Sequence, residues 1–341
     1  MVSFAFWNNK GGTGKTSLGF QAICKYAFTH PNRRILVVDL CPQANLSELL
    51  LGGLVGDGSI RLLELHRSDP RRSVGGYFQL RLPSPYALPA GIQATDFICT
   101  PASFNKQVPE NLDLLPGDGI VELQANAIAT LANTQIPGTN TWQAVIDWMR
   151  DFLELVTDRY QTVLLDTNPS FSVYTQIALA AAELLVLPVM ADDSSRRAIE
   201  NAFTLVHGAN LPSPIYAPYS FSTKLEQSGR SAPLIHLVVK NRLTQYMGSA
   251  SAFHTVLTAI DNLVRNQQQS TPQMFSPAAQ TNGMVEVRDF GTTGVVAFAE
   301  GTPFDRLRAG IHNVMGKSVT VNKDYINDCN SAIKGIVDRL P

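Results

Sequence analysis

Short apolar runs alternate along this chain with longer stretches whose apolar positions recur at helical spacing. Several runs, such as Val163–Leu165 and Leu184–Leu187, are apolar at every position, which is typical of central strands in a parallel sheet covered on both faces. The pattern predicts strands at Val2–Trp7, Ile35–Asp39, Leu112–Leu115, Thr162–Asp166, Leu184–Val189 and Leu234–Lys240. We therefore predict an α/β fold: a doubly wound, mostly parallel sheet flanked by helices.

The helical spacing predicts helices between and after these strands. They are Gly14–Thr29, Leu46–Leu51, Ile120–Asn133, Thr141–Thr157, Val173–Ala182, Ser194–His207, Ser249–Asn266, Pro303–Val314 and Lys323–Leu340. Two proline-rich or polar stretches, Arg67–Pro109 and Gln267–Gly283, are predicted to be irregular surface excursions. Neither resembles a separate domain, so we expect one domain over residues 1–341 with long excursions at about 55–111 and 267–283.

Composition narrows the class of protein. The 341 residues are 45% hydrophobic and 16% charged, which suits a large packed core and argues against disorder. The 27 Lys and Arg residues nearly balance the 28 Asp and Glu residues. This balance excludes a protein that coats nucleic acid through bulk positive charge, so any contact with DNA needs a local basic patch.

The cysteines and the apolar segments indicate in which cellular compartment the protein resides. The cysteines are Cys24, Cys41, Cys99 and Cys329. They are far apart, with no Cys-x-x-Cys pair and no His at metal-ligand spacing. The first residues lack the basic segment of a secretory signal, and Glu183 and Pro188 interrupt the longest apolar stretch, Ile177–Ala191. We expect a reduced protein in the cytoplasm.

The strongest chemical signal is the glycine-rich segment Asn9–Ser17, between the first predicted strand and the first predicted helix. Glycines let backbone N–H groups turn towards phosphate oxygens, and the helix N-terminus adds its positive end. Lys15 can reach the β- and γ-phosphates, and the Thr16 hydroxyl can hold Mg²⁺. The predicted ATP-binding residues in this loop are Gly11, Gly12, Thr13, Gly14, Lys15, Thr16 and Ser17.

An extra lysine distinguishes this loop. The general pattern has a glycine five residues before Gly14, where this chain has Asn9 followed by Lys10. In this the chain resembles the deviant Walker A ATPases of the ParA/MinD family, and most of all the ParA-type partition ATPases. The resemblance implies a P-loop fold, ATP and Mg²⁺ as cofactors, and a homodimer that forms on ATP binding. It also implies catalytic roles for Lys10 and Lys15, with Lys10 crossing the dimer interface to the partner's phosphates.

Two further segments are similar to the family's motifs in the correct order. Arg34–Asn45 is similar to a strand ending in Asp-x-Asp-Pro-Gln-Gly/Ala-Asn, and Thr162–Ser170 is similar to the Walker B segment. Asp39 and Asp166 close these strands, where open α/β sheets gather ligands. By resemblance both aspartates approach Mg²⁺ through its waters, and Asp39 is catalytic. Taken alone, either aspartate would equally suit a helix cap or a turn.

The resemblance breaks at Cys41, which stands where the family has a carboxylate associated with the attacking water. A thiol accepts hydrogen bonds weakly and is uncharged at its ordinary pKa of about 8.5. Because a lost water-orienting group slows phosphoryl transfer strongly, we expect slow hydrolysis and a long-lived ATP state. Alternatively, Asp192 or Asp193 orients the water, a partner protein completes the site, or Cys41 is a small buried residue without effect on the rate.

A late asparagine is the candidate for base recognition. In the family an asparagine that follows a late strand reads the adenine edge, and Asn241 stands in the matching place. A plain turn asparagine is the alternative interpretation. The segment Val287–Val296 is loosely similar to the family's last strand region and its base-flanking loop.

The DNA and membrane interactions of the family have weaker signals here. ParA-type relatives bind DNA non-specifically, and the best basic cluster in this chain is Arg61–Leu82, which also contains Tyr77 and Phe78. Its arginines are Arg61, Arg67, Arg71, Arg72 and Arg81. A solvated basic loop explains this cluster equally well. The C-terminal apolar stripe from Ile326 to Leu340 has balanced charges, which favours packing onto the protein over binding to anionic lipid.

The leading hypothesis is a ParA-like ATPase that dimerises on ATP, binds non-specific DNA and thereby associates with the nucleoid. A ParB-like partner would stimulate hydrolysis, and the cycle would position or segregate plasmid or chromosomal DNA. A MinD-like ATPase that cycles on membranes is an alternative, as is a nucleotide-gated scaffold with poor hydrolysis because of Cys41. An iron–sulfur carrier on the same fold would need paired cysteines, and Cys99 has no convincing mate.

Overall fold

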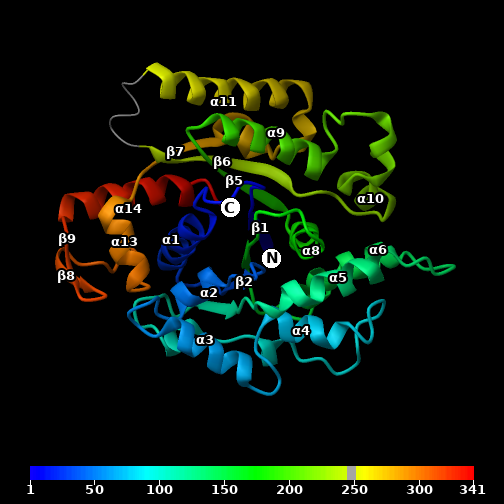
Figure 1. Ribbon diagram of the computed structural model, residues 1–341, viewed down its shortest axis with the longest axis horizontal. Coiled ribbons are helices and arrows are strands. Elements are labelled where there is room, and N and C mark those ends of the chain that lie inside the picture. The colour runs from blue at the N-terminus through cyan, green and yellow to red at the C-terminus, as the bar shows by residue number, and fades with distance from the viewer. Residues whose placement is uncertain (244–250) are drawn as a thin grey trace.

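A seven-stranded parallel sheet runs through the molecule in the computed structural model, which describes residues 1–243 and 251–341 (Figure 1). The strands are β1 (Val2–Phe6), β2 (Ile35–Asp39), β3 (Leu112–Leu115), β4 (Thr162–Asp166), β5 (Leu184–Met190), β6 (Leu234–Leu243) and β7 (Met284–Arg288). Their order is β3-β2-β4-β1-β5-β6-β7, and every neighbouring pair is parallel. The predicted doubly wound α/β fold is confirmed.

Alternate residues of each strand point to opposite faces of the sheet, and each face has its own core. Phe4 and Phe6 of β1 pack on one side, and Ala5 and Trp7 pack on the other. The first side is covered by α1 (Lys15–Thr29), α2 (Asn45–Leu50), α3 (Gly58–Arg67), α13 (Gly291–Ala299) and α14 (Lys323–Val337).

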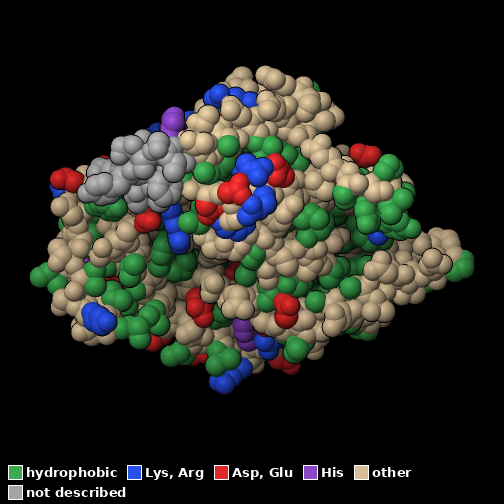
Figure 2. All heavy atoms as spheres, turned by 45° about the horizontal axis from the view of Figure 1, so that its top comes forward, with side chains coloured by type: hydrophobic (Ala, Val, Ile, Leu, Met, Phe, Trp, Pro, Cys, Tyr) green, Lys and Arg blue, Asp and Glu red, His purple; other side chains and the backbone are tan. Residues whose placement is uncertain are grey.

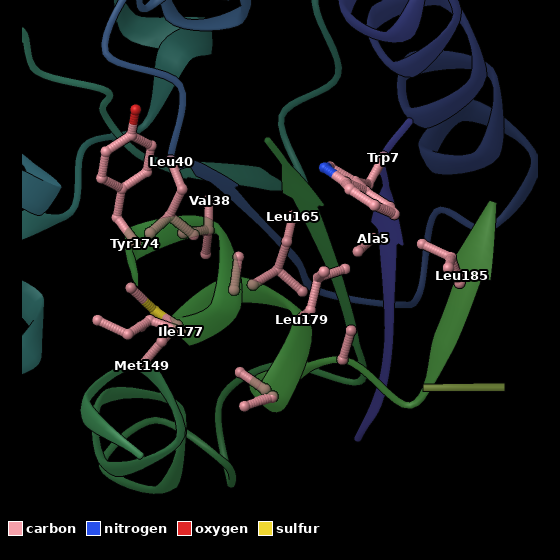
Figure 3. Packing of buried hydrophobic residues seen from close by; sticks show 14 of the residues in the cluster. Ala5, Trp7, Val38, Leu40, Met149, Leu165, Tyr174, Ile177, Leu179 and Leu185 are labelled. Carbon is pink, nitrogen blue, oxygen red and sulfur yellow. The ribbon is translucent and has the colours of Figure 1, made fainter. Parts of the chain in front are cut away.

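The second side carries more helices (Figure 1). They are α4 (Val74–Arg81), α5 (Ile120–Asn133), α6 (Thr141–Ile146), α7 (Trp148–Glu154), α8 (Val173–Ala181), α9 (Asp193–His207), α10 (Phe221–Gln227), α11 (Ser251–Ser270) and α12 (Pro277–Asn282). Short 3₁₀ turns lie at Ala94–Phe97, Pro101–Ser103, Pro214–Tyr219 and Pro272–Met274. Figure 3 shows Leu179 of α8 next to Leu165 of β4, and Ile177 of α8 beside Met149 of α7. This packing fixes the strand ends from which the site is built.

The proline-rich stretch Arg67–Pro109 is more ordered than predicted. It contains α4, whose Ser73 cap accepts a hydrogen bond from the Gly76 N–H and whose Val74, Tyr77 and Phe78 are buried in the core. Gln267–Gly283 likewise contains the end of α11 and α12. The irregular prediction is wrong for α4 and for most of Gln267–Gly283, whereas the rest of Arg67–Pro109 is irregular or in short 3₁₀ turns. Tertiary packing stabilises α4 and α12, which are too short to form on propensity alone.

The prediction of a helix at Pro303–Val314 is also wrong. Its second half is β8 (Gly310–Val314), which pairs antiparallel with β9 (Lys317–Val321). Met315 and Gly316, with φ of 50° and 80°, form a two-residue turn that suits the twist of a hairpin.

Two other helix predictions need adjustment. The helix predicted at Thr141–Thr157 is divided at Asp147 into α6 and α7. The helix predicted at Ser249–Asn266 begins outside the described residues, and α11 continues it to Ser270.

Candidate nucleotide-binding site

The glycine-rich loop connects β1 at the centre of the sheet to the N-terminus of α1. Gly12 and Gly14 have φ of 73° and 87°, a region that residues with a side chain rarely adopt. A Cβ on Gly12 would meet nothing, whereas a Cβ on Gly14 would lie 2.2 Å from Asn241 Nδ2. Gly11 and Gly12 are exposed, and Thr16 and Ser17 lie in the half-buried first turn of α1. The loop thus presents backbone N–H groups at a helix N-terminus, as an anion site requires.

The Lys15 side chain turns back under this loop. Its ammonium donates to the backbone carbonyls of Asn8 at 3.3 Å and Lys10 at 3.2 Å. Burial lowers the pKa of Lys15, while the charge of Asp166 acts in the opposite direction. Asn8, which sequence analysis missed, also accepts from the Lys10 N–H at 3.0 Å and donates to the Pro188 carbonyl at 2.8 Å. These internal hydrogen bonds hold the loop in this shape.

Asp39 and Asp166 lie side by side at the ends of β2 and β4, where they are register partners. Their exposed fractions are 0% and 1%. Burial raises the pKa of both carboxyls, and the Asp39 charge adds to the rise at Asp166. The Thr16 hydroxyl donates to Asp166 Oδ2 at 2.9 Å, so the predicted residues Thr16, Asp39 and Asp166 are brought together.

Asp39 has a second set of partners that sequence analysis missed. Its Oδ2 accepts from the Ser47 N–H at 2.9 Å and the Ser47 hydroxyl at 2.7 Å, and its Oδ1 accepts from the Cys41 N–H at 3.1 Å. The Gly117 N–H donates to the same Ser47 hydroxyl at 2.8 Å. Asp39 therefore also fixes the start of α2 and the loop after β3. The only sequence signal for Ser47 is its place just after the second motif.

Several buried acceptor oxygens around the loop lack a hydrogen-bond partner. They are Asn9 Oδ1, Thr13 Oγ1, Asp166 Oδ1 and Asn241 Oδ1. Because buried polar atoms are nearly always paired, this cluster indicates a polar ligand. A free carboxylate oxygen next to a Thr hydroxyl fits Mg²⁺ held partly through water, and the neighbouring lysines fit phosphate.

Lys10 has an ion-pair partner within its own chain. Its ammonium donates to Asp192 Oδ2 at 2.5 Å and to the Ser195 hydroxyl at 3.2 Å. Partial burial acts to raise the pKa of Asp192, but hydrogen bonds from Lys10 and from the Ser195 N–H outweigh it and lower this pKa to about 2. Asp193 pairs instead with Arg196 at 3.0 Å and with Arg197. Both carboxylates that were alternatives for orienting water are thus engaged in ion pairs.

Cys41 is 8% exposed and lies within electrostatic range of Asp39, Asp166 and Lys15. Burial raises the pKa of its thiol to about 12, and Asp39 and Asp166 add to the rise. The other cysteines, including Cys99, are also buried, and in the part of the chain that the structure describes no three His, Cys, Asp or Glu residues group as metal ligands.

Asn241 lies within β6, opposite Met190 of β5, and not in a turn as one interpretation held. It is 3% exposed and its Nδ2 donates to the Thr13 carbonyl at 2.9 Å. The loosely matched segment Val287–Val296 contains the end of β7 and the start of α13. Asn241 therefore contacts the loop directly, and its contact with adenine stays a prediction.

The basic cluster Arg61–Leu82 does not form an open patch. Arg71 binds Asp118 at 2.6 Å, and Arg81, only 1% exposed, binds Asp151 at 2.6 Å. Arg61 donates to two backbone carbonyls. Tyr77 and Phe78 are buried, so they cannot stack on bases, whereas Arg67 and Arg72 are exposed, and a DNA contact at this cluster stays a prediction.

On the face drawn in Figure 2, a group of Lys and Arg side chains lies at the centre, and Asp and Glu side chains lie among them. Among the described residues, no helix is long and apolar enough to cross a membrane. The apolar stripe of α14, including Ile326, Ile333 and Ile336, is buried in the core, as predicted.

The fold and the loop define a P-loop nucleotide-binding protein. The AAA_31 family model, described as an AAA domain, matches residues 1–209, and the chain belongs to this family. The similar proteins include a curated ParA family protein and solved ParA structures, so the fold is that of a ParA-type P-loop protein. The chain is 26% identical over 187 residues to the virulence plasmid ParA family protein pGP5-D of Chlamydia psittaci, covering 55% of this chain and 56% of that protein. The alignments thus span about half or less of the length of the curated relatives.

Solved structures of similar fold extend over nearly the whole chain. An ATP complex of Cyanothece McdA has a TM-score of 0.61 at 14% identity, covering 99% of this chain and 96% of that one. The ParA of pNOB8 bound to nonspecific DNA has a TM-score of 0.52 at 15% identity, covering 99% of each chain. At these identities the likeness establishes the fold.

We predict that Gly14→Ala destabilises the nucleotide-free protein more than Gly12→Ala. Both glycines have positive φ, so both variants carry backbone strain of about 1 kcal/mol. Only the new Cβ at position 14 meets the Asn241 amide, which must move and lose its bond to the Thr13 carbonyl. Urea denaturation should show a further loss of about 1–2 kcal/mol for Gly14→Ala. Equal losses would contradict the contact.

Proposed function

We propose that this chain is an ATP-dependent dimerising switch of ParA type, acting through one domain over residues 1–341. The observation that carries the proposal is the loop with two lysines beside a Thr16–Asp166 pair, surrounded by buried acceptors without partners. In this assignment the loop from Gly11 to Ser17 binds the phosphates, Lys15 contacts the β- and γ-phosphates, and Asn241 contacts adenine.

The metal-binding part of the proposal rests on the same residues. Thr16 and Asp166 would hold Mg²⁺, with Asp39 in the next layer because both of its oxygens already accept hydrogen bonds. When bound, Mg²⁺ would neutralise phosphate charge. Asp39 also keeps α2 and the Cys41 backbone in place, so its catalytic contribution includes the shape of the site.

The cellular role follows from the relatives. A ParA family protein is among them, and a protein of similar fold is bound to nonspecific DNA. We infer that the ATP dimer binds DNA without sequence preference, associates with the nucleoid and positions or segregates plasmid or chromosomal DNA. A ParB-like partner would stimulate hydrolysis.

We expect ATP with Mg²⁺ to convert the protein from monomer to dimer, whereas ADP does not. Lys10→Ala should stay monomeric with ATP, because the lysine that reaches across the interface is lost. Lys317→Ala, which removes an exposed lysine of the β8–β9 hairpin, is the matched control and should dimerise normally. Size-exclusion chromatography with light scattering measures this. A wild type that stays monomeric with ATP would contradict the sandwich mechanism.

Gel shifts on unrelated DNA duplexes at two salt concentrations then test whether DNA is the cargo. Binding should require ATP and weaken steeply with salt. Binding that is absent at low salt, or indifferent to ATP, would remove the partition role.

The thiol at position 41 favours a second candidate function, a nucleotide-gated scaffold that hardly hydrolyses ATP. We expect Cys41→Asp to raise the single-turnover hydrolysis rate by about 10- to 100-fold, because a carboxylate can orient the attacking water. Cys41→Asn, which matches the size of Asp without its charge, should not produce this rise. If Asp also leaves the rate unchanged while the fold is intact by circular dichroism, position 41 does not limit the chemistry.

A further inference from the structure

The ammonium of Lys10 is held by its own chain at the place where the loop meets α9. The ion pair with Asp192 joins the glycine-rich loop to the loop after β5, and the Ser195 hydroxyl completes the contact. The Lys10 and Asp192 side chains are 22% and 41% exposed, so the pair is at the edge of the site and not sealed in the core. The Lys10 ammonium is therefore bound to a carboxylate of its own chain, that of Asp192.

The two oxygens of Asp192 have separate tasks. Oδ1 accepts from the Ser195 N–H at 2.7 Å and the Ser194 hydroxyl at 2.9 Å and so caps α9, whereas Oδ2 accepts from Lys10. Lys10 can therefore leave without uncapping the helix. An open surface depression of about 400 Å³ is lined by Lys10, Arg197 and Asn201 among others, so Lys10 borders solvent-filled space.

We propose that Asp192 is a positioning residue for Lys10, which it holds in cis until the phosphates of ATP displace it. A phosphate group carries more charge than one carboxylate and accepts stronger hydrogen bonds, so it competes well with a half-exposed ion pair. Breaking the Lys10–Asp192 pair costs free energy, and this cost raises the ATP concentration needed for dimerisation. This step rests on the proposed function, because the competing anion is bound ATP.

A backbone contact links this step to the other lysine of the loop. Lys15 donates to the Lys10 carbonyl at 3.2 Å. The Lys15 ammonium has a third N–H donor, so it can contact phosphate while it still holds the backbone that carries Lys10.

The first test needs no nucleotide. Reductive methylation of the full chain, followed by mass spectrometry of the peptide carrying Lys10, measures how available this amine is. Asp192→Asn keeps a good helix cap and removes the charge, and it should speed methylation of Lys10 about fivefold relative to exposed Lys317. Asp193→Asn, which alters only the pairs with Arg196 and Arg197, should not. An unchanged Lys10 rate in Asp192→Asn would overturn the proposal.

The second test uses dimerisation. Asp192→Asn should lower the ATP concentration for half-maximal dimer formation about fivefold, and Asp193→Asn should leave it unchanged. A higher or unchanged requirement in Asp192→Asn would overturn the proposal. Asp192→Ser, which is also a good cap, replaces Asp192→Asn in this test if thermal denaturation shows that the Asn variant is not folded. If wild type fails to dimerise with ATP, the proposed function fails, and the methylation result still decides whether Asp192 restrains Lys10.

Discussion

Two carboxylates, Asp39 and Asp166, lie next to each other in the interior at the ends of adjacent parallel strands. Burying two like charges together is unfavourable unless cations or hydrogen-bond donors surround them. Ser47, the Cys41 N–H and Thr16 supply donors, and the Lys15 ammonium lies within electrostatic range of Asp166. The positions of α1, α2 and the loop after β3 all follow from this requirement.

Some charged and polar groups of the site keep hydrogen-bonding capacity that the protein does not use, and a ligand fits there. Asp166 keeps one oxygen without a partner, and Lys15 is held by backbone carbonyls instead of by an anion. A metal ion and a phosphate would satisfy these groups together, because the cation meets the carboxylate and the anion meets the lysine.

Sequence analysis predicted most of the sheet and the core of the site, because both depend on local signals. Apolar runs mark the strands, and the glycines and lysines of the loop lie within nine residues of one another. Contacts between distant residues were not predictable. Arg71 and Arg81 pair with carboxylates 47 and 70 residues away, which removes them from the expected DNA patch. Lys10 and Asp192 are 182 residues apart, and only the packing of β5 beside β1 brings them together.

We propose that Thr16 and Asp166 form, with the loop lysines, a site for ATP together with Mg²⁺. Isothermal titration calorimetry of ATP with and without Mg²⁺, on wild type and Thr16→Val, tests this site. We expect one ATP per chain, bound about tenfold more tightly with Mg²⁺, and loss of that gain in Thr16→Val. Affinity that does not depend on Mg²⁺, or a gain that survives in Thr16→Val, would contradict it.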